Sequence, residues 1–377
     1  MAEALKADVV IVGGGTAGCS TALHLRQRGL SVVLLEARLC GSQASGVNYG
    51  GVRRQGRAYP ELPLATRSRA VWDRLPSLVG HDGEFVVSGH LKLARSDAEM
   101  AELETWATGA RERGVGVELF GRNAIRARYP WLGEQVIGAS LVADDGHANP
   151  RLVAPLFARA ARKAGATLRE QTRVTAASRD AGGFIVGTDK GVTVRASTLV
   201  NVAGAWGHEI AAMFGDRLPE ELMTPNMCVT EPLPFVVEHN LGVVGGNVYI
   251  RQIARGNVIF GGGSGWGDAG AGRARALPPI TSGAIARAVE VVPGLRGARL
   301  LRSWSGLEGA MPDGIPVIGA SPSTPGLIHA FGFSGHGFQL GPGMGEILGE
   351  LVLEGRSATP LQPFAPERFA AAGIAAR

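Results

Sequence analysis

The chain has 377 residues, of which 45% are hydrophobic and 19% charged, a composition typical of a folded globular protein rather than a disordered or fibrous one. Its length exceeds the usual size of one hydrophobic core, so we expect two domains, or one domain with a large insertion. The formal net charge of +5 is spread without runs of like charge, which argues against nucleic acid as a partner and weakly favours anionic small molecules.

The cysteines and the apolar segments indicate a cellular compartment. Cys19, Cys40 and Cys228 form no CxxC motif and no even framework, which argues against a zinc site, a redox dithiol or a secreted disulfide scaffold. No stretch of about 18 apolar residues occurs, and the N-terminus lacks signal-peptide character. We therefore expect a cytoplasmic protein, with peripheral docking on the inner membrane as an alternative.

The first 36 residues predict a strand, a helix and a second strand. Residues 8–12 form a short β-rich run that ends in glycines, and 16–28 carry helical spacing before Gly29. The next run, SVVLLE, has the composition of a buried strand. This βαβ opening indicates a parallel sheet covered by helices.

The rest of the chain alternates between helical and strand-like segments. Helices are expected over 61–79, 97–113, 151–164 and near 343–354, the third opened by an Asn149 cap and Pro150. Strands are expected over 84–94, within 166–202, and near 227–231, 247–250 and 257–260. The later strands are short and turn-bounded, as in an antiparallel sheet.

These segments predict an α/β fold in which a Rossmann-like nucleotide-binding domain is interrupted by an α+β substrate domain built on a mostly antiparallel sheet. The predicted nucleotide-binding domain is discontinuous and comprises residues 1–83, 144–212 and 293–377. The predicted substrate domain comprises residues 84–143 and 213–292.

A glycine motif lies where the first strand meets the first helix. Gly13, Gly15 and Gly18 give GxGxxG, in which the first glycine permits a tight turn, the second lets a pyrophosphate approach, and the third lets helix and strand pack closely. The helix N-terminus supplies N–H groups for phosphate. Glu36 ends the second strand, where a carboxylate can accept ribose hydroxyls and repel a 2′-phosphate. The motif predicts FAD or NAD rather than NADP.

A second match to the same spacing provides a comparison. Gly265, Gly267 and Gly270 also fit GxGxxG, but the following GRARALPPI cannot open a helix smoothly, so we expect a loop there. A single complete unit argues against separate FAD and NAD sites.

Four further glycine-rich or apolar segments lie outside this motif. They are GSQASGVNYGGVRRQGR, VNVAGAW, SWSGLEGAMPDGIPVIG and HAFGFSGHGFQLGPGMG. Together with the glycine loop they resemble the D-amino-acid-oxidase-like flavoproteins, which include glycine oxidase, sarcosine oxidase, D-amino-acid dehydrogenases and opine oxidase subunits. The resemblance covers nearly the whole chain and is strongest to the opine-oxidase-like branch. It implies FAD, held without a covalent link, because the positions of the family's tethering cysteine and histidine read SGLEGAMPD and VNYGG here.

The resemblance implies a path for the cofactor. Residues 41–51 would wrap the pyrophosphate and ribityl chain, and the loop at His336 would place N–H groups and a helix dipole beside the flavin ring. Trp206 and His336 could instead be structural residues. The implied cofactor-binding residues are Gly13, Gly15, Thr16, Ala17, Gly18, Glu36, Ala37, Arg38, Ser42, Ala44, Ser45, Gly46, Asn48, Tyr49, Gly50, Gly51, Val174, Ala203, Gly204, Trp206, Gly306, Gly335, His336, Gly337 and Phe338.

One position departs from the family pattern. Glycine-oxidase-like members carry an arginine that clamps the substrate carboxylate, and this chain has Glu308 there. Either Glu308 faces a cationic substrate group or an internal arginine such as Arg302 pairs with it.

A carboxylate anchor would then lie elsewhere in the chain. Arg53, Arg54 and Arg57 follow the flavin loop in the region where sarcosine-oxidase-like members place theirs, and RAY favours Arg57. The alternative is that these arginines are solvated or face phosphate.

A strand in the second half resembles the family strand that presents a tyrosine and a basic residue over the flavin. Tyr249 and Arg251 in VYIRQ alternate and so share a face. A core tyrosine is the alternative. We expect Tyr249, Arg251 and His336 to be the catalytic residues, and Arg53, Arg54, Arg57, Tyr249, Arg251 and Glu308 to bind substrate.

The expected reaction is oxidation of the C–N bond of an amino acid or an N-substituted, opine-like amino acid. Hydride would pass to flavin N5, and the imine would hydrolyse. Ile259 stands near the place of an oxygen-activating lysine, which slightly favours a quinone or a partner subunit over O2 as acceptor. The alternatives are a flavin monooxygenase, a non-catalytic or electron-transferring FAD subunit of a larger complex and, least favoured, a protein that binds NAD alone.

Overall fold

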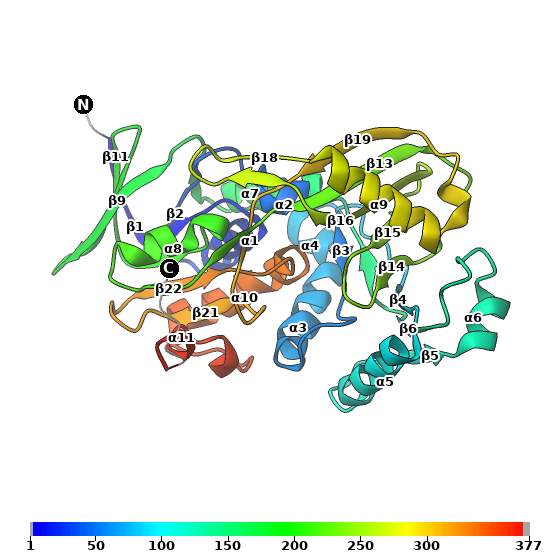
Figure 1. Cartoon of the computed structure of the whole chain (residues 1–377). Helices are drawn as coiled ribbons and strands as arrows, with labels where there is room; N and C mark the ends of the chain where they lie inside the picture. The colour runs from blue at the N-terminus through cyan, green and yellow to red at the C-terminus, as the bar shows by residue number, and fades with distance from the viewer. Residues whose placement is uncertain (1–2, 372–377) are drawn as a thin grey trace.

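The structure is a computed structural model that describes residues 3–371. Two eight-stranded sheets dominate it and lie at opposite ends of an elongated molecule (Figure 1). Both marked chain ends lie beside the first sheet. No helix within the described range is long and apolar enough to cross a membrane.

The first sheet has a parallel core with the strand order β21-β22-β11-β1-β2-β8. Its strands are β1 (Glu3–Val12), β2 (Val32–Leu35), β8 (Thr167–Arg169), β9 (Val174–Asp180), β10 (Gly183–Thr188), β11 (Val192–Asn201), β21 (Val317–Ala320) and β22 (Leu327–Phe331). Strand β21 pairs antiparallel to β22, and β9 and β10 form an antiparallel extension on β11. The central strands are buried on both faces, as expected for a parallel sheet covered by other elements.

Helices with apolar faces cover one side of this sheet. They are α1 (Thr16–Gln27), α3 (Leu62–Asp73), α7 (Pro150–Lys163) and α10 (Gly337–Glu354). Helix α1 packs against both α7 and α10, and α3 packs against α10. Helix α7 begins as predicted, because the Asn149 side chain accepts a hydrogen bond from the Arg151 N–H (3.1 Å) and proline is its first residue.

The second sheet has the order β19-β13-β16-β15-β14-β4-β6-β5 and is antiparallel except between β14 and β4. Its strands are β4 (His90–Ala94), β5 (Glu118–Phe120), β6 (Gly138–Val142), β13 (Pro225–Pro232), β14 (Asn240–Val243), β15 (Tyr249–Gln252), β16 (Asn257–Ser264) and β19 (Leu300–Ser305). Helix α9 (Pro278–Val291) packs against β13 and β16. Sequence reasoning did not predict α9.

Short elements connect the two sheets. The paired strands are β3 (Gly51–Val52) with β7 (Gly146–His147), β12 (Glu221–Met223) with β20 (Glu308–Ala310), and β17 (Trp266–Asp268) with β18 (Arg273–Arg275). The remaining α-helices are α2 (Ala44–Val47), α4 (Leu75–Val79), α5 (Asp97–Arg111), α6 (Arg122–Arg128), α8 (Gly207–Ala212) and α11 (Arg368–Ala371).

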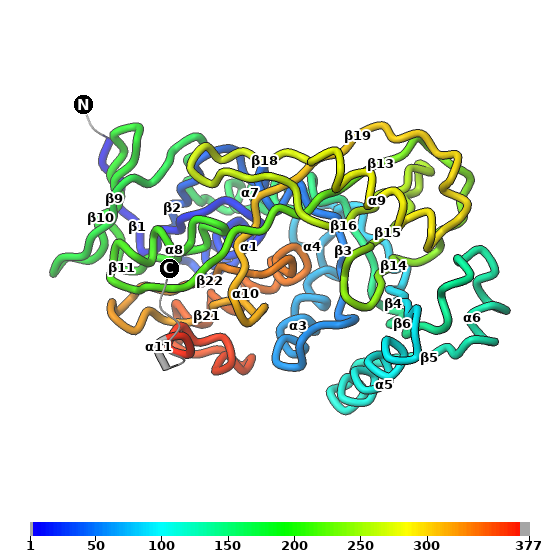
Figure 2. Tube along the Cα trace, viewed as in Figure 1, coloured from blue at the N-terminus to red at the C-terminus, as the bar shows by residue number. Residues whose placement is uncertain are grey.

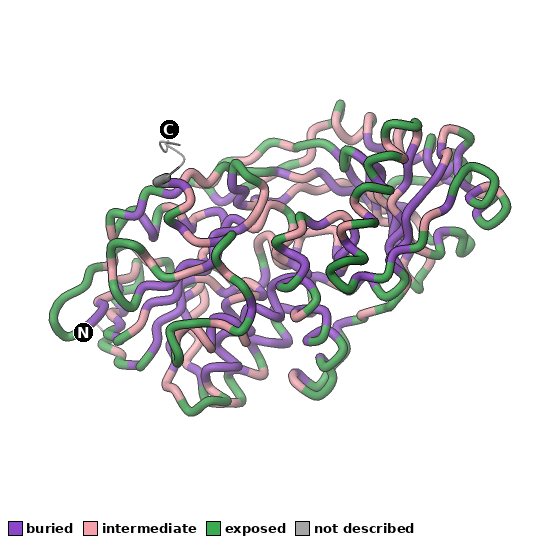
Figure 3. The backbone as a smooth tube through the Cα atoms, turned by 90° about the horizontal axis from the view of Figure 1, so that it is seen from below, coloured by how far each residue is buried: buried purple, intermediate pink, exposed green. Residues whose placement is uncertain are grey.

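The chain passes repeatedly between the two ends of the molecule. After α4 it leaves the first sheet, builds β4, β5 and β6, and returns through β7 and α7; it then leaves again for β13 to β19 (Figure 2). Buried residues follow the strands and the helices packed on them at both ends (Figure 3). Each sheet therefore has its own hydrophobic core.

The predicted fold class is confirmed, with a parallel, helix-covered sheet and a second, mostly antiparallel one. One segment lies differently from the predicted division: β19 pairs with β13 in the second sheet, although it falls within residues 293–377, which we expected in the nucleotide-binding domain. We keep the remaining domain boundaries as a proposal.

Two predicted element boundaries were wrong. The strand expected over 84–94 begins only at His90, because Gly83, Glu84 and Gly89 have positive φ and turn the chain. Helix α10 begins at Gly337 rather than near 343 and continues through Pro342. The Ser68 hydroxyl accepts from the Gly343 N–H (3.0 Å), so a neighbouring helix supplies a partner beside the proline.

Candidate functional site

A cavity of about 1370 Å³, including its open mouth, lies at the carboxyl edge of the parallel strands β1, β2, β11 and β22. This is where ligands bind in open α/β sheets. Predicted cofactor residues that line the cavity are Gly13, Gly15, Thr16, Ala17, Glu36, Ala37, Arg38, Ser42, Ala44, Ser45, Asn48, Val174, Ala203, Gly204, Trp206, Gly335, Gly337 and Phe338. Those that lie outside its lining are Gly18, Gly46, Tyr49, Gly50, Gly51, Gly306 and His336.

The first and third glycines of the loop are required by space. Gly13 has φ of 116°, and a Cβ there would lie 2.3 Å from the Val202 carbonyl oxygen. A Cβ at Gly18 would lie 2.0 Å from the Gly13 carbonyl oxygen. Gly18 therefore acts through the packing of α1 on β1, which explains its absence from the cavity wall.

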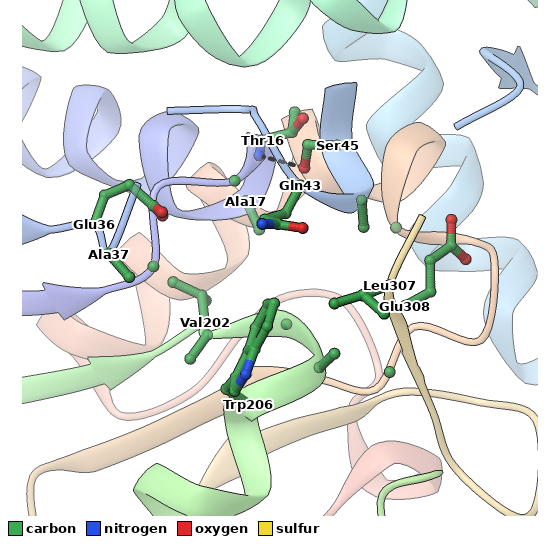
Figure 4. A pocket seen from close by; sticks show the side chains of 18 of the residues that line it. Thr16, Ala17, Glu36, Ala37, Gln43, Ser45, Val202, Trp206, Leu307 and Glu308 are labelled. Carbon is green, nitrogen blue, oxygen red and sulfur yellow. Dashed lines mark hydrogen bonds between the residues drawn. The ribbon is translucent and has the colours of Figure 1, made fainter. Parts of the chain in front are cut away.

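The start of α1 presents polar groups to the cavity. Gly15 is the N-cap and offers no side chain, so the first-turn N–H groups other than that of Thr16 stay open to a ligand. The Thr16 N–H donates to the Ser45 hydroxyl (3.0 Å), an interaction visible in Figure 4. The Thr16 hydroxyl is buried without a partner among the described residues. An orphaned hydroxyl beside a helix N-terminus suits a phosphate oxygen.

Glu36 follows β2 at one end of the cavity. Its carboxylate accepts from the backbone N–H groups of Gly14 (2.6 Å) and Arg38 (2.7 Å), which fix its orientation. Burial raises the pKa of this carboxyl group. Each carboxylate oxygen keeps a further lone pair, so the group can still accept from two ribose hydroxyls.

A hairpin covers the neighbouring part of the cavity. The Trp206 indole N–H donates to the Ala269 carbonyl (2.9 Å), and the Arg38 guanidinium donates to the Ala271 carbonyl (3.1 Å). Both acceptors lie in the turn between β17 and β18. Trp206 thus lines the cavity and also anchors the hairpin. The second GxGxxG match, expected to be a loop, forms β17 and the turn of this hairpin instead, and helix α9 begins at Pro278, within GRARALPPI.

Glu308 lies at the other end of the cavity from Glu36 (Figure 4). Its carboxylate has no hydrogen bond or ion pair among the described residues, and loss of solvent around it raises its pKa to about 7. Arg302 is exposed on β19 and makes no ion pair with it. The alternative in which Arg302 satisfies Glu308 internally is therefore wrong.

Tyr249 and Arg251 on β15 both contact Tyr49. The two tyrosine rings meet edge to face, with centroids 4.9 Å apart, and the Arg251 guanidinium lies 5.4 Å from the Tyr49 ring centroid. Arg251 is 3% exposed, its Nε lacks a partner in residues 3–371, and burial lowers its pKa to about 10. The Tyr249 hydroxyl donates to the Asn226 carbonyl (2.9 Å). A Cβ at Gly50 would lie 2.7 Å from Arg251 Nη2, so Gly50 makes room for this side chain.

The three arginines after the flavin loop have different surroundings. Arg54 pairs with Asp144 and Asp145, so its charge is already compensated by protein. Arg53 donates to the Gln55 carbonyl. Arg57 is 2% exposed, its Nη1 has no partner in the described chain, and burial together with nearby Arg53 lowers its pKa to about 9. We therefore withdraw Arg54 as a substrate anchor and keep Arg57.

His336 lies between two cavity-lining glycines, yet its side chain contacts Glu61 instead. The His336 Nδ1 lies 2.8 Å from a Glu61 carboxylate oxygen, and Glu61 is fully buried. Burial lowers the pKa of His336 to about 4. The pair links η1 (Tyr59–Glu61) to the start of α10 and so positions the loop that lines the cavity.

Sequence reasoning missed several residues of this region. Gln43, Leu307 and Gly309 line the cavity, and Glu61 holds His336. Lys92 on β4 lies near Arg53, across Gly56. Gln43 had a signal because it falls inside the predicted wrapping loop, and Leu307 and Gly309 had one because they flank Glu308 in a segment that resembles the family. The described residues contain no group of His, Cys, Asp and Glu side chains placed to hold a metal.

Comparison with known proteins agrees with this site. The sequence model of the DAO family, described as FAD dependent oxidoreductase, matches residues 8–351. Glycine oxidase of Geobacillus kaustophilus is 29% identical over 96% of this chain and 97% of its own length. An opine oxidase subunit of Rhizobium meliloti is 27% identical over 97% of this chain and 98% of its own.

Solved structures show the same similarity. The crystal structure of glycine oxidase from G. kaustophilus superposes with a TM-score of 0.90 at 28% identity, covering 97% of this chain and 99% of that one. The crystal structure of L-proline dehydrogenase from P. horikoshii also superposes with a TM-score of 0.90, at 27% identity, and the superposition covers 99% of this chain and 100% of that one. The glycine cradle, the orphaned Thr16 hydroxyl and the oriented Glu36 carboxylate fit the dinucleotide half of FAD. The chain belongs to the DAO family of FAD-dependent oxidoreductases.

Proposed function

We propose that this protein oxidises the C–N bond of an amino acid or an N-substituted amino acid. The observation that carries the proposal is Glu308, an unpartnered and desolvated carboxylate that lines the FAD cavity at the end remote from Glu36. Bound FAD supplies the hydride acceptor, its N5 atom. Relatives named glycine oxidase and subunits of sarcosine oxidase and opine oxidase are consistent with amine chemistry.

Glu308 would bind the substrate nitrogen. A desolvated carboxylate without a partner attracts a cationic group, and an ammonium ion compensates its charge. With a pKa near 7, the same carboxylate can accept a proton from the ammonium and leave the neutral amine, whose lone pair assists loss of the Cα hydride. Water then hydrolyses the imine to a carbonyl product and an amine or ammonia.

Arg251 would bind the carboxylate next to the reacting carbon, and Arg57 is a second candidate for binding an anionic group of the substrate. Both guanidinium groups are nearly fully buried, and each has a nitrogen without a hydrogen-bond partner in the described residues. A carboxylate is the ligand that a guanidinium binds in a bidentate manner. Tyr49 and Tyr249, stacked edge to face between Arg251 and Glu308, would fix the distance between the two ends of the substrate.

His336 is better described as a positioning residue than as an acid or base. Its low pKa keeps the ring neutral at neutral pH, and Glu61 fixes its orientation. The ring would hold the α10 N-terminus and Gly335 in place beside the cavity. We therefore withdraw a direct catalytic role for His336.

The electron acceptor belongs to the same proposal. We favour a quinone or a partner subunit over O2, because Ile259 stands where some oxidases of this group carry an oxygen-activating lysine. The opine oxidase and sarcosine oxidase relatives are named as subunits, which supports a hetero-oligomer. The same names favour a second candidate, an FAD subunit without turnover of its own.

Anaerobic titration of the FAD-loaded protein tests the proposal. Amino acids and N-substituted amino acids are added while the oxidised flavin absorbance is followed. Loss of that band with at least one amine supports C–N oxidation. If no amine reduces the flavin, while a chemical reductant does, the proposal fails; copurification of a second chain with such a protein would favour the non-catalytic role.

A further inference from the structure

A second cavity is lined in part by Arg57. It occupies about 870 Å³, including its mouth, between the segment that precedes η1 and helix α5. Residues that line it include Gly56, Arg57, Tyr59, Lys92, Glu102 and Trp106. Of these residues, Arg57 is also a candidate for binding an anionic group of the substrate in the proposed reaction.

Two cationic residues line this cavity, Arg57 and Lys92, and neither forms an ion pair with the described residues. Arg57 is almost fully buried, and its Nη1 has no hydrogen bond in residues 3–371. Lys92 is half-buried and makes neither a hydrogen bond nor an ion pair within the same range. Burial and the neighbouring Arg53 lower the pKa of Lys92. Cationic residues that line one cavity without an ion pair are costly to desolvate unless an anion joins them.

Gly56 keeps the space between these cations open. Its φ is 67°, and the position that a Cβ would take lies 3.0 Å from Lys92 Nζ and 3.7 Å from Arg53 Nη1. A side chain at this position would crowd the Lys92 ammonium, and the positive φ itself disfavours any residue other than glycine. Gly56 thus leaves room for Lys92 beside Arg53, at the cavity that Arg57 also lines.

Neighbouring carboxylates form no ion pair with Arg53, Arg57 or Lys92 in the described chain. The charge of Glu61 raises the pKa of Arg57 and Arg53 from a distance, and its hydrogen bond goes to His336. Asp145 accepts from the backbone N–H groups of Arg54 and Gln55 and pairs with the Arg54 side chain. Glu102 is exposed at the rim, and its charge raises the pKa of Lys92 without forming an ion pair. His90, also buried nearby, has a pKa well below its usual range and adds no anion.

We propose that Arg57 and Lys92 form an anion subsite that binds a carboxylate of the substrate remote from the C–N bond that is oxidised. The inference rests on the proposed amine oxidation and assigns it a narrower substrate class, amines that carry a second carboxylate. Arg251, on the other side of Tyr49, remains for the carboxylate next to the reacting carbon. Arg57 lies between the two regions, since it lines the second cavity and is close to His336.

The test uses the FAD-loaded protein and non-oxidisable probes. Glutarate and butyrate differ by one terminal carboxylate, and their dissociation constants are measured by calorimetry. We expect glutarate to bind at least about tenfold more tightly than butyrate, the effect of one charge-assisted contact. Lys92→Met should reduce this preference to within about threefold, and Lys92→Arg should retain it. The matched control is Lys190→Met, which removes an exposed lysine of the β10–β11 turn.

Equal binding of the two probes by the wild-type protein would overturn the subsite, as would an unchanged preference in Lys92→Met. The flavin spectrum and the unfolding temperature of each variant show that it is folded, and Lys92→Gln repeats the test with a polar side chain. Flavin reduction by amines that differ only in a distal carboxylate separates the two proposals. Reduction without a preference contradicts the subsite alone, whereas glutarate selectivity without reduction by any amine contradicts the oxidation alone.

Discussion

Replacing Glu308 with glutamine tests how the FAD cavity recognises an amine. The substitution keeps the shape of the side chain and removes its charge. A charge-assisted contact to a desolvated carboxylate contributes about 1.5–3 kcal/mol, so Glu308→Gln should weaken amine binding by roughly 10- to 100-fold. FAD affinity should stay unchanged, because Glu308 lies at the cavity end remote from the glycine loop.

The pH dependence gives the sharper readout. The pKa of Glu308 is raised from 4.5 to about 7, so amine binding by the wild-type protein should tighten as pH rises from 6 to 8 and the carboxylate ionises. Glu308→Gln has no such group and should lose this part of the pH profile. The measurement is the amine concentration at half-maximal flavin reduction, taken anaerobically at each pH. A variant with wild-type affinity and an unchanged profile would refute the role of Glu308.

The raised pKa of Glu308 also affects the stability of the protein without bound substrate. A folded-state pKa above the unfolded value means that the stability from Glu308 is fully present below about pH 4.5 and is lost as pH rises through about 7. At pH 8 the loss is at most about 3 kcal/mol, from about 1.4 kcal/mol per pKa unit. Glu308→Gln should therefore unfold up to about 4 °C higher than wild type at pH 8, and at the same temperature at pH 4. A lower unfolding temperature at pH 8 would show that Glu308 has a partner in solution.

Three further substitutions test other parts of the site. Glu36→Gln removes the charge that faces the ribose, so the FAD dissociation constant should rise roughly 30-fold, which corresponds to about 2 kcal/mol of binding free energy. A fluorescence titration of the apoprotein with FAD measures this constant. A rise of less than about threefold would contradict the role of Glu36. Gly18→Ala places a Cβ 2.0 Å from a carbonyl oxygen and should abolish FAD binding, whereas Gly294→Ala, with open space around it, should not. Arg251→Met should raise the substrate concentration needed for half-maximal flavin reduction at least about tenfold. Wild-type substrate affinity in this variant would exclude Arg251 as the group that binds the substrate carboxylate. The control is Arg255→Met, which removes an exposed arginine.

The dinucleotide half of the site could be predicted from sequence because its determinants are local. Gly13, Gly15 and Gly18 act within one strand–turn–helix unit, and Glu36 ends the next strand. The positions of these residues follow from the backbone geometry of a βαβ unit, whatever the rest of the chain does. The fold class could be predicted in the same way, because the spacing of apolar residues distinguishes helices from strands within short segments.

The substrate half depends on long-range packing, which the sequence pattern does not reveal. Whether Glu308 is paired depends on where Arg302 falls, and β19 places that arginine on an exposed edge of the second sheet. Glu61 meets His336 across 275 positions of sequence. Helix α10 begins early because Ser68, on another helix, supplies a hydrogen bond beside Pro342. The sequence near each of these residues does not indicate which distant residue it contacts.

Identification of the products of a single anaerobic turnover tests C–N oxidation most directly. The FAD-loaded protein is mixed with an amine that reduces it, and the carbonyl and nitrogen products are quantified against the flavin reduced. C–N oxidation predicts one carbonyl compound and one amine or ammonia for each flavin, with no reduction by the corresponding hydroxy acid. Reduction by the hydroxy acid alone, or flavin reduction without release of nitrogen, would contradict the account.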